Sequence, residues 1–268
     1  MKVYLVLLCC GRADLLSLTL SSFVNFCKDI SDHEIHVVIS DDSGDVELNK
    51  RVEKVTRENL KDHVRSFTFR NGKNVGQSAS YWQCINLISK TGANDDDVVF
   101  LLEEDWNFLQ DFKISDLSRT LKEKIQDHEV ASVALKCDVD NFHEYESNGY
   151  NLVSHENYFI YVPGSLSYLA YSRGNCVHNE IICFHPHAIL WKKAKKYVDE
   201  YDHEKLIHIR ESAERLLGLI TPGMRVFHKD KVYAEHTGDY RIISVFPGAK
   251  IRKGVSMISI DEAKRTKN

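Results

Sequence analysis

The first hundred residues alternate between short apolar runs and amphipathic stretches. The apolar runs predict buried strands at 3–8, 35–39, 66–69 and 98–102. The stretches between them repeat apolar residues at helical spacing, and predict helices at about 15–26, 46–60 and 79–88. Strands that alternate with helices in this way predict βαβ units around a mostly parallel sheet, the arrangement of a Rossmann-like α/β fold.

The pattern is less regular after residue 110. Apolar spacing predicts helices at 117–125, 188–201 and about 204–219, and strands at 130–135, 225–228 and 231–234. Residues 138–178 are rich in Asn, Tyr, Ser and Gly and predict a hairpin or long loops. No internal repeat or linker interrupts the chain, so we expect one continuous domain with an elaborated C-terminal half and a polar tail over 250–268.

Charge and cysteine content narrow the class of protein. The net charge of −4 over 268 residues gives no reason to expect a dedicated nucleic-acid binder, although residues 186–268 are mildly basic. Seven cysteines without paired metal spacing favour a reducing, cytoplasmic location. The apolar run after Met1 lacks the cleavage site of a signal peptide, and no stretch reaches the ~18 apolar residues of a membrane span, so we expect no integral membrane segment.

The clearest candidate chemistry follows the apolar run 98–102, which ends abruptly in Glu103, Glu104 and Asp105. Ligand sites of open α/β sheets lie just beyond the carboxyl ends of strands. Carboxylate oxygens suit Mg²⁺ or Mn²⁺, which are typically held by one or two acids plus substrate phosphates. A helix start would also place acids here, because negative charge suits a helix N-terminus.

Two further strands end in polar groups that would meet at the same edge. Arg12 follows the first strand and is suited to face a phosphate, while Asp41 and Asp42 follow the second and are suited to accept hydrogen bonds from a base or a ribose. Turns favour Asp and Gly in any case, so each group alone is weak evidence. Their order and spacing together favour a sugar-nucleotide site.

With these motifs the chain resembles the GT-A-fold glycosyltransferases, most closely the inverting family 2 type. The resemblance covers roughly residues 3–108. It rests on Ile-Ser-Asp-Asp-Ser-Gly-Asp at 39–45, on Asn-Val-Gly-Gln-Ser-Ala at 74–79, and on Phe-Leu-Leu-Glu-Glu-Asp at 100–105. Glu-Glu-Asp replaces the commoner Asp-x-Asp, which is a departure from the family pattern.

The resemblance implies roles for the residues of this half. Asp41 or Asp42 would contact the nucleoside, and the turn with Asn74 and Gly76 would border the same donor. Asp105, as the last acid, would be the direct ligand of Mn²⁺ or Mg²⁺. Two more residues would complete the donor site, Glu103 at the ribose or the water shell of the metal and Arg12 at a phosphate.

The C-terminal half matches the family more loosely. The family pattern implies a general base at the start of a helix, and Glu211 and Glu214 are the candidates, because their spacing puts both on one helical face. Both would otherwise be solvated acids. His236, in a strand that ends His-x-Gly, would complete the metal shell or touch the diphosphate, and Arg241 would neutralise the leaving diphosphate.

The implied reaction is transfer of a sugar from a nucleoside-diphosphate sugar, such as a UDP-sugar, to a hydroxyl group, with inversion. Residues 1–110 would bind the donor, and 111–249 would bind the acceptor and supply the base. A glycan or lipid-linked saccharide is the default acceptor, and a modified DNA base is a minority alternative. Two other functions stay open, a nucleotidyltransferase and an inactive sugar-nucleotide-binding protein.

Overall fold

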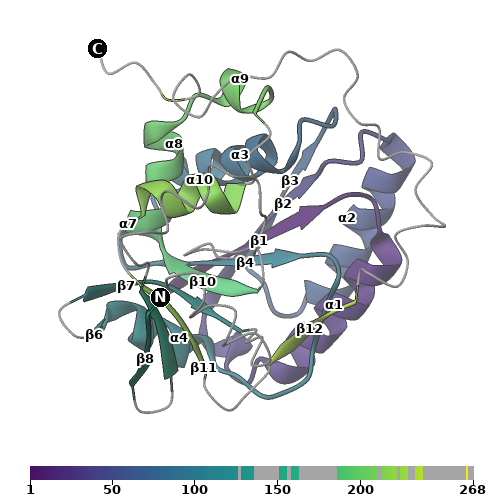
Figure 1. Cartoon of the computed structure of the whole chain (residues 1–268). Helices are drawn as coiled ribbons and strands as arrows, with labels where there is room; N and C mark the ends of the chain where they lie inside the picture. The colour runs from purple at the N-terminus through teal and green to yellow at the C-terminus, as the bar shows by residue number, and fades with distance from the viewer. Residues whose placement is uncertain are drawn as a thin grey trace.

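Four parallel strands from the first hundred residues form one half of a large sheet. They are β1 (Lys2–Cys9), β2 (Glu34–Asp41), β3 (Ser66–Asn71) and β4 (Val98–Glu103), in the order β3-β2-β1-β4. The computed structural model describes residues 1–125, 128–135, 151–155, 158–162, 186–209, 213–221, 224–228, 233–237 and 264. Its cartoon shows the four strands side by side (Figure 1).

The second half of the chain extends this sheet with strands of both directions. Next to β4 the order continues β10-β7-β11-β9-β8, in which β10 runs antiparallel to both of its neighbours and β11 runs parallel to β7. Their bounds are β7 (His128–Ala134), β8 (Asn151–His155), β9 (Tyr158–Val162), β10 (His187–Leu190) and β11 (Met224–His228). The short β6 (Lys124–Ile125) pairs with β7, and β5 (Trp106–Phe108) pairs with β12 (Ala234–His236) in a separate two-stranded sheet.

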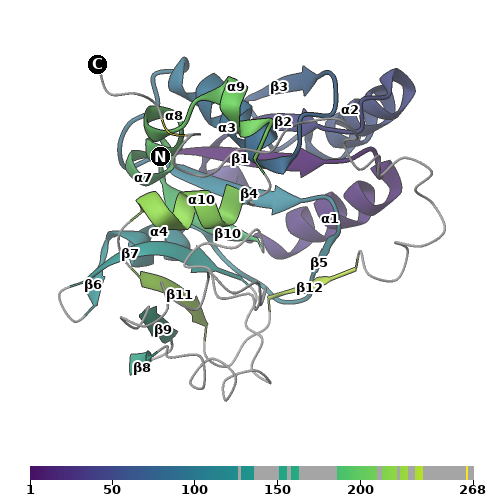
Figure 2. The same ribbon diagram turned by 45° about the horizontal axis from the view of Figure 1, so that its top comes forward.

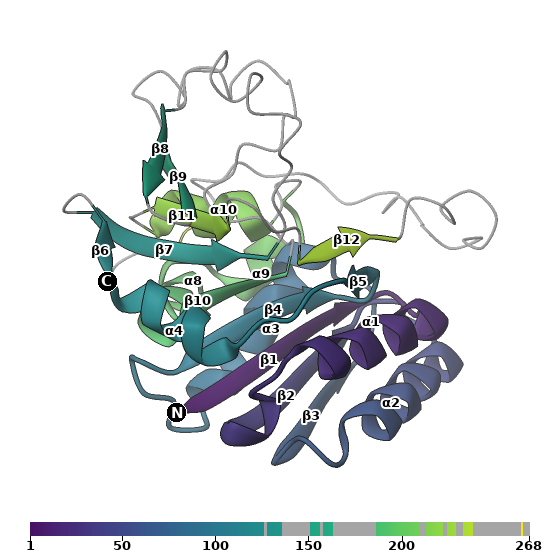
Figure 3. The ribbon, with the colours of Figure 1, turned by 90° about the horizontal axis from the view of Figure 1, so that it is seen from below.

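Helices cover both faces of the sheet, as the views from above and from below show (Figures 2 and 3). One face carries α1 (Ala13–Phe26), α2 (Val46–Leu60) and α4 (Ile114–Lys122). The other carries α3 (Gln77–Ser89), α7 (Trp191–Ala194), α8 (Lys196–Glu200), α9 (His203–Leu206) and α10 (Ala213–Ile220). A 3₁₀ turn at Ile30–Asp32 leads from α1 into β2. No helix in the described part of the chain is long and apolar enough to cross a bilayer.

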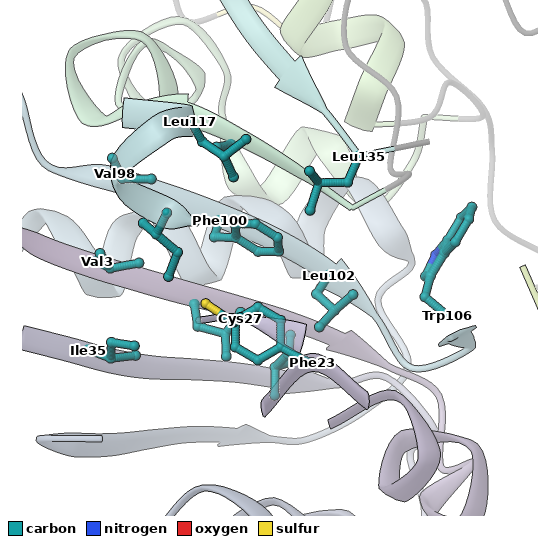
Figure 4. Packing of buried hydrophobic residues seen from close by; sticks show 14 of the residues in the cluster. Val3, Phe23, Cys27, Ile35, Val98, Phe100, Leu102, Trp106, Leu117 and Leu135 are labelled. Atoms are coloured by element: carbon teal, nitrogen blue, oxygen red, sulfur yellow. The ribbon is translucent and has the colours of Figure 1, made fainter. Parts of the chain in front are cut away.

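Two apolar layers hold the helices to the sheet, and the alternation of side chains along each strand separates them. In β4, Val98, Phe100 and Leu102 face α1, whereas Val99 and Leu101 belong to the layer under α3. All five are fully buried. Figure 4 shows Phe23 of α1 against Phe100 in the first of these layers. Burial on both faces explains why β4 reads as a continuous apolar run.

The predicted elements of the first half are confirmed, with ends shifted by a few residues. In the second half, the helix predicted at 117–125 is also confirmed with shifted ends, since it begins at Ile114 and ends at Lys122. Two other predictions in this half are wrong. The helix predicted at 188–201 begins with a strand, β10, because a short strand buried on both faces has the same apolar run as a buried helix. The helix predicted at 204–219 breaks after Leu206.

Asp29 provides a first test of the fold, because it caps α4 from a distant part of the chain. Its carboxylate accepts the N–H groups of Ile114 (2.8 Å) and Ser115 (2.9 Å). Burial opposes the charged form, but these hydrogen bonds outweigh burial and hold the pKa of Asp29 below its ordinary value. We expect Asp29→Ala to lower the free energy of unfolding by about 2 kcal/mol at pH 7, measured by urea denaturation.

The pH dependence of this effect has a definite sign. A lowered pKa means that the stabilisation is present above the pKa of the unfolded carboxyl, about 3.9, and is lost as the pH falls through the native value. The difference between the wild type and Asp29→Ala will therefore shrink in acid. Asp32→Ala, an exposed acid on the adjacent 3₁₀ turn, is the control, and an equal effect of both variants at pH 7 would contradict the capping role.

Candidate functional site

The carboxyl ends of β1, β2 and β4 lie level with one another. Leu8 of β1 pairs with Ser40 of β2 and with Glu103 of β4, so that the turn after each strand begins at the same edge of the sheet. The residues that follow carry the predicted site: Arg12, Asp42 and Asp105. The parallel register thus brings together three segments that are far apart in the sequence.

Strand alternation sends the two adjacent glutamates to opposite faces. Glu103 lies on the α3 face, where its Oε1 accepts a hydrogen bond from Nε2 of Gln77 (3.1 Å). Glu104 continues the series of Phe100 and Leu102 toward α1 and is fully buried. Glu103, which was predicted to contact the ribose or the water shell of the metal, therefore lies beside the first turn of α3. Glu104 lies under the β1–α1 turn.

Glu104 organises the turn between β1 and α1. Its Oε1 accepts hydrogen bonds from the N–H of Cys10 (2.9 Å) and from Nε of Arg12 (2.5 Å), and its Oε2 accepts the N–H of Arg12 (3.1 Å). A buried carboxylate requires such partners, because an unpaired charge in the interior is costly. Glu104 therefore fixes both the backbone and the side chain of Arg12.

Asp105 receives partners from both ends of the chain. Its Oδ2 pairs with Nη1 of Arg12 (2.7 Å) and with Nε2 of His236 (3.2 Å). His236 reaches the site because β12 pairs with β5, and Thr237 fixes that approach by donating its N–H and its hydroxyl to the carbonyl oxygen of Asp105 (2.8 and 3.0 Å). The His236 ring also packs on Trp106, with centroids 5.0 Å apart.

Helix α1 holds the same segment from the other side. The hydroxyl of Thr19 donates to the carbonyl oxygen of Glu104 (2.8 Å) and accepts the N–H of Trp106 (3.0 Å). The three acids thus sit in a turn whose backbone is anchored by two threonines, Thr19 and Thr237. Such anchoring suits a site that must hold its groups in one geometry.

The buried charges shift one another's pKa values. Burial raises the pKa of Glu104, and its contacts with Arg12 and two N–H groups lower it by less, so that the pKa is about 7. Burial also opposes ionisation of Asp105, but His236 and Arg12 outweigh burial and hold the pKa of Asp105 below its ordinary value. Burial lowers the pKa of Arg12, while Glu104 and Asp105 raise it by more. Arg12 and Asp105 are therefore both charged at neutral pH.

The acidic pair after β2 connects two loops. Asp41 is fully buried and accepts hydrogen bonds from Ser43 (3.1 Å) and Asn49 (2.6 Å). The carboxylate of Asp42 accepts the N–H groups of Val75 (2.6 Å) and Gly76 (2.7 Å), at the start of α3.

Asn74 completes this junction by donating its amide to the carbonyl oxygen of Asp42 (2.7 Å). Gly76 has a φ of +83°, a backbone conformation that residues other than glycine rarely adopt. The structure therefore places Asp41, Asp42, Asn74 and Gly76 together in one junction at the C-terminal edge of the sheet.

The side chains at Asp105 offer oxygen and nitrogen atoms of the kinds that a divalent ion accepts as ligands. Oδ1 of Asp105 is buried and makes no hydrogen bond in the described part of the protein. Nε2 of His236 lies 3.2 Å from Oδ2 of the same carboxylate, so the imidazole is near an ion that Oδ1 would hold. No group of three His, Cys, Asp or Glu side chains among the described residues could hold a metal ion by itself.

Besides His236, the sequence predicted three site residues in the C-terminal half: Glu211, Glu214 and Arg241. Glu211 and Arg241 lie outside the described residues. Glu214 is the second residue of α10, a helix that packs against α3 through Ala213, Leu216 and Leu217. The structure thus brings Arg12, Asp105 and His236 into contact but does not test the choice of base.

The resemblance implied no role for Glu104, although the sequence contains a signal for one. Once 98–102 is a strand buried on both faces, strict alternation puts position 104 on the same face as Phe100 and Leu102. An acid that points into an apolar layer needs a cationic partner, and Arg12 opens the helix on that face. Thr19 and Thr237 carried no comparable signal, because their role depends on the tertiary contact.

Gly11 tests the close packing of the β1–α1 turn. It has a φ of +80°, and a Cβ there would lie 2.8 Å from Cδ1 of Leu48 and 3.1 Å from Cβ of Ser43. We expect Gly11→Ala to cost about 2 kcal/mol of unfolding free energy, since backbone strain and a steric clash add. Gly92→Ala is the matched control, because Gly92 has a φ of +70° and open space around it. Equal losses in the two variants would show that packing at Gly11 does not matter.

Comparison with known proteins supports the fold. No family model matches the chain, and no curated protein sequence matches it. Among solved structures, S. aureus TarS 1–349 aligns with 88% of this chain at 12% identity and a TM-score of 0.54, and its complex with UDP aligns with 87% at 11% identity and a TM-score of 0.53. The chain spans 60% of the length of each of these structures. The chain therefore has the GT-A fold of glycosyltransferases.

Proposed function

We propose that this chain is a glycosyltransferase that moves a sugar from a nucleoside-diphosphate sugar to a hydroxyl group of an acceptor. The observation that carries the proposal is the contact of Arg12, Asp105 and His236 at the C-terminal edge of a GT-A sheet. A cation, a carboxylate with one buried oxygen that makes no hydrogen bond to the described residues, and an imidazole are groups suited to hold a metal and a diphosphate. TarS was solved with UDP, which makes UDP-sugars the first donors to test.

The donor would lie across the turns that follow β1, β2 and β4, within residues 1–110. We assign the nucleoside to the junction of Asp42, Asn74 and Gly76, because Asp42 keeps an exposed fraction of 9%. Asp41, which is fully buried, supports that junction through its hydrogen bonds with Ser43 and Asn49. Glu103, on the α3 face, is assigned to the ribose.

Asp105 and His236 would hold Mn²⁺ or Mg²⁺ beside the diphosphate. When bound, the ion acts as a Lewis acid that offsets the charge on the leaving diphosphate. Residues 111–249 would bind the acceptor, a glycan or lipid-linked saccharide by default. In this half we assign Arg241 to the diphosphate and Glu211 or Glu214 to deprotonation of the acceptor hydroxyl, with inversion at the sugar carbon.

The product released from the donor tests the proposal. The full chain is incubated with a panel of nucleoside-diphosphate sugars, UDP-sugars first, with and without Mn²⁺. Release of the nucleoside diphosphate, dependent on Mn²⁺, supports the glycosyltransferase. Release of pyrophosphate would instead indicate nucleotidyl transfer, and a thermal shift with a UDP-sugar but no product with any acceptor would indicate a sugar-nucleotide-binding protein.

A further inference from the structure

Arg12 places a positive charge on the carboxylate that is assigned to the metal. Its Nη1 lies 2.7 Å from Oδ2 of Asp105, and its side chain is only 23% exposed. Arg12 therefore compensates the charge of Asp105 before any divalent ion arrives. A metal that approaches Asp105 meets a neutralised acid and a fixed cation next to it.

Glu104 keeps Arg12 in this position. It accepts hydrogen bonds from both the N–H and the Nε of Arg12, and its side chain is 1% exposed. Because the guanidinium is planar and rigid, fixing Nε also fixes the direction of Nη1. Movement of Arg12 away from Asp105 would leave Glu104 buried without its counter-ion, which is strongly unfavourable.

The contacts of Asp105 leave one of its oxygens for a metal. Oδ2 is taken by Arg12 and His236, whereas Oδ1 is buried and makes no hydrogen bond to the residues that the structure describes. Because Oδ1 and Oδ2 belong to one carboxylate, an ion at Oδ1 would lie near the guanidinium that contacts Oδ2. Two neighbouring cations in a partly buried site repel each other strongly. A diphosphate bound at the same place would supply the negative charge that removes this repulsion.

We propose that Arg12, held by Glu104, is a built-in counter-cation of Asp105 that keeps divalent metal affinity low in the free protein and makes metal binding depend on the diphosphate of the donor. This inference rests on the proposed function, because it concerns the same metal and the same donor. Metal and nucleotide then bind cooperatively, and each raises the affinity for the other by the same factor.

Direct Mn²⁺ binding, followed by the electron paramagnetic resonance signal of the free ion, tests the proposal without any turnover. For the wild type we expect UDP to raise the affinity for Mn²⁺ by about tenfold or more. Arg12→Gln removes the cation and keeps a hydrogen-bonding side chain. Without UDP it should bind Mn²⁺ about tenfold more tightly than the wild type, and its enhancement by UDP should fall.

Two variants control for charge and for fold. Arg12→Lys retains the positive charge but not the planar guanidinium, so without UDP it should bind Mn²⁺ more weakly than Arg12→Gln does. Arg119→Gln makes the same change as Arg12→Gln on the exposed face of α4, where Arg119 pairs only with the nearby Asp116 in the contacts described, and should behave as the wild type. Thermal melting of each variant confirms that it is folded.

Several outcomes would overturn the inference. Unchanged or weaker Mn²⁺ binding by a folded Arg12→Gln variant would contradict the role of Arg12. Equal Mn²⁺ binding by the wild type with and without UDP would also overturn the inference, and this measurement does not require the variant to fold. Both results leave the proposed function standing. A wild type that binds no Mn²⁺ even with UDP would defeat the metal assignment of the proposed function together with this inference.

Discussion

Replacing Asp105 by Asn will lower kcat/KM for the donor on the order of a thousandfold, measured as release of the nucleoside diphosphate with Mn²⁺ at saturating acceptor. The substitution keeps the shape of the side chain and an oxygen for Arg12, but it removes the negative charge that attracts a divalent ion. Asp105 is 4% exposed and anchored through its carbonyl oxygen by Thr237, so the amide will occupy the same place.

The control for this variant is Asp95→Asn, the same chemical change just before β4, at the opposite edge of the sheet. Asp95 pairs there with Lys195 at 2.7 Å, and its loss should leave turnover within about twofold of the wild type. Full turnover by Asp105→Asn would show that this acid does not hold the metal. A loss shared equally by both variants would point to a general effect of charge instead.

Replacing Phe23 by Ala will lower the free energy of unfolding by about 4 kcal/mol, measured by urea denaturation. Phe23 is 1% exposed and lies between α1 and the sheet, where its ring centroid is 5.4 Å from that of Phe100, 5.5 Å from that of Phe108 and 5.8 Å from that of Phe112. Figure 4 shows Phe23 among the other apolar side chains of this cluster. Its removal leaves a cavity that rigid neighbours cannot close.

A second substitution on the same helix separates packing from helix propensity. Leu18→Ala changes an apolar side chain that is 57% exposed on α1, and we expect it to alter the stability by less than about 0.5 kcal/mol. Because α1 also carries Thr19, which holds the turn at Glu104, Phe23→Ala should reduce activity before it unfolds the protein. Similar stabilities of the two variants would contradict the packing described for Phe23.

The local sequence pattern was sufficient to predict an element wherever the residues of that element show a clear period or a continuous apolar run. The run at 98–102 predicted a buried strand, which β4 confirms, and the acids at its end led us to predict a site at that edge of the sheet. By contrast, β10 could not be separated from a helix, because all four of its residues are buried, His187 included, and no exposed position reveals a period of two.

The amino-acid sequence alone specifies the parallel half of the sheet and which turns carry charged groups, because both follow from short-range periodicity and turn chemistry. How those groups pair depends on tertiary packing. Glu104 rather than Glu103 meets Arg12 because strand alternation and the packing of α1 direct it there, and His236 reaches Asp105 only because β12 pairs with β5. Such contacts join segments far apart in the chain, and their energies depend on burial that no local pattern records.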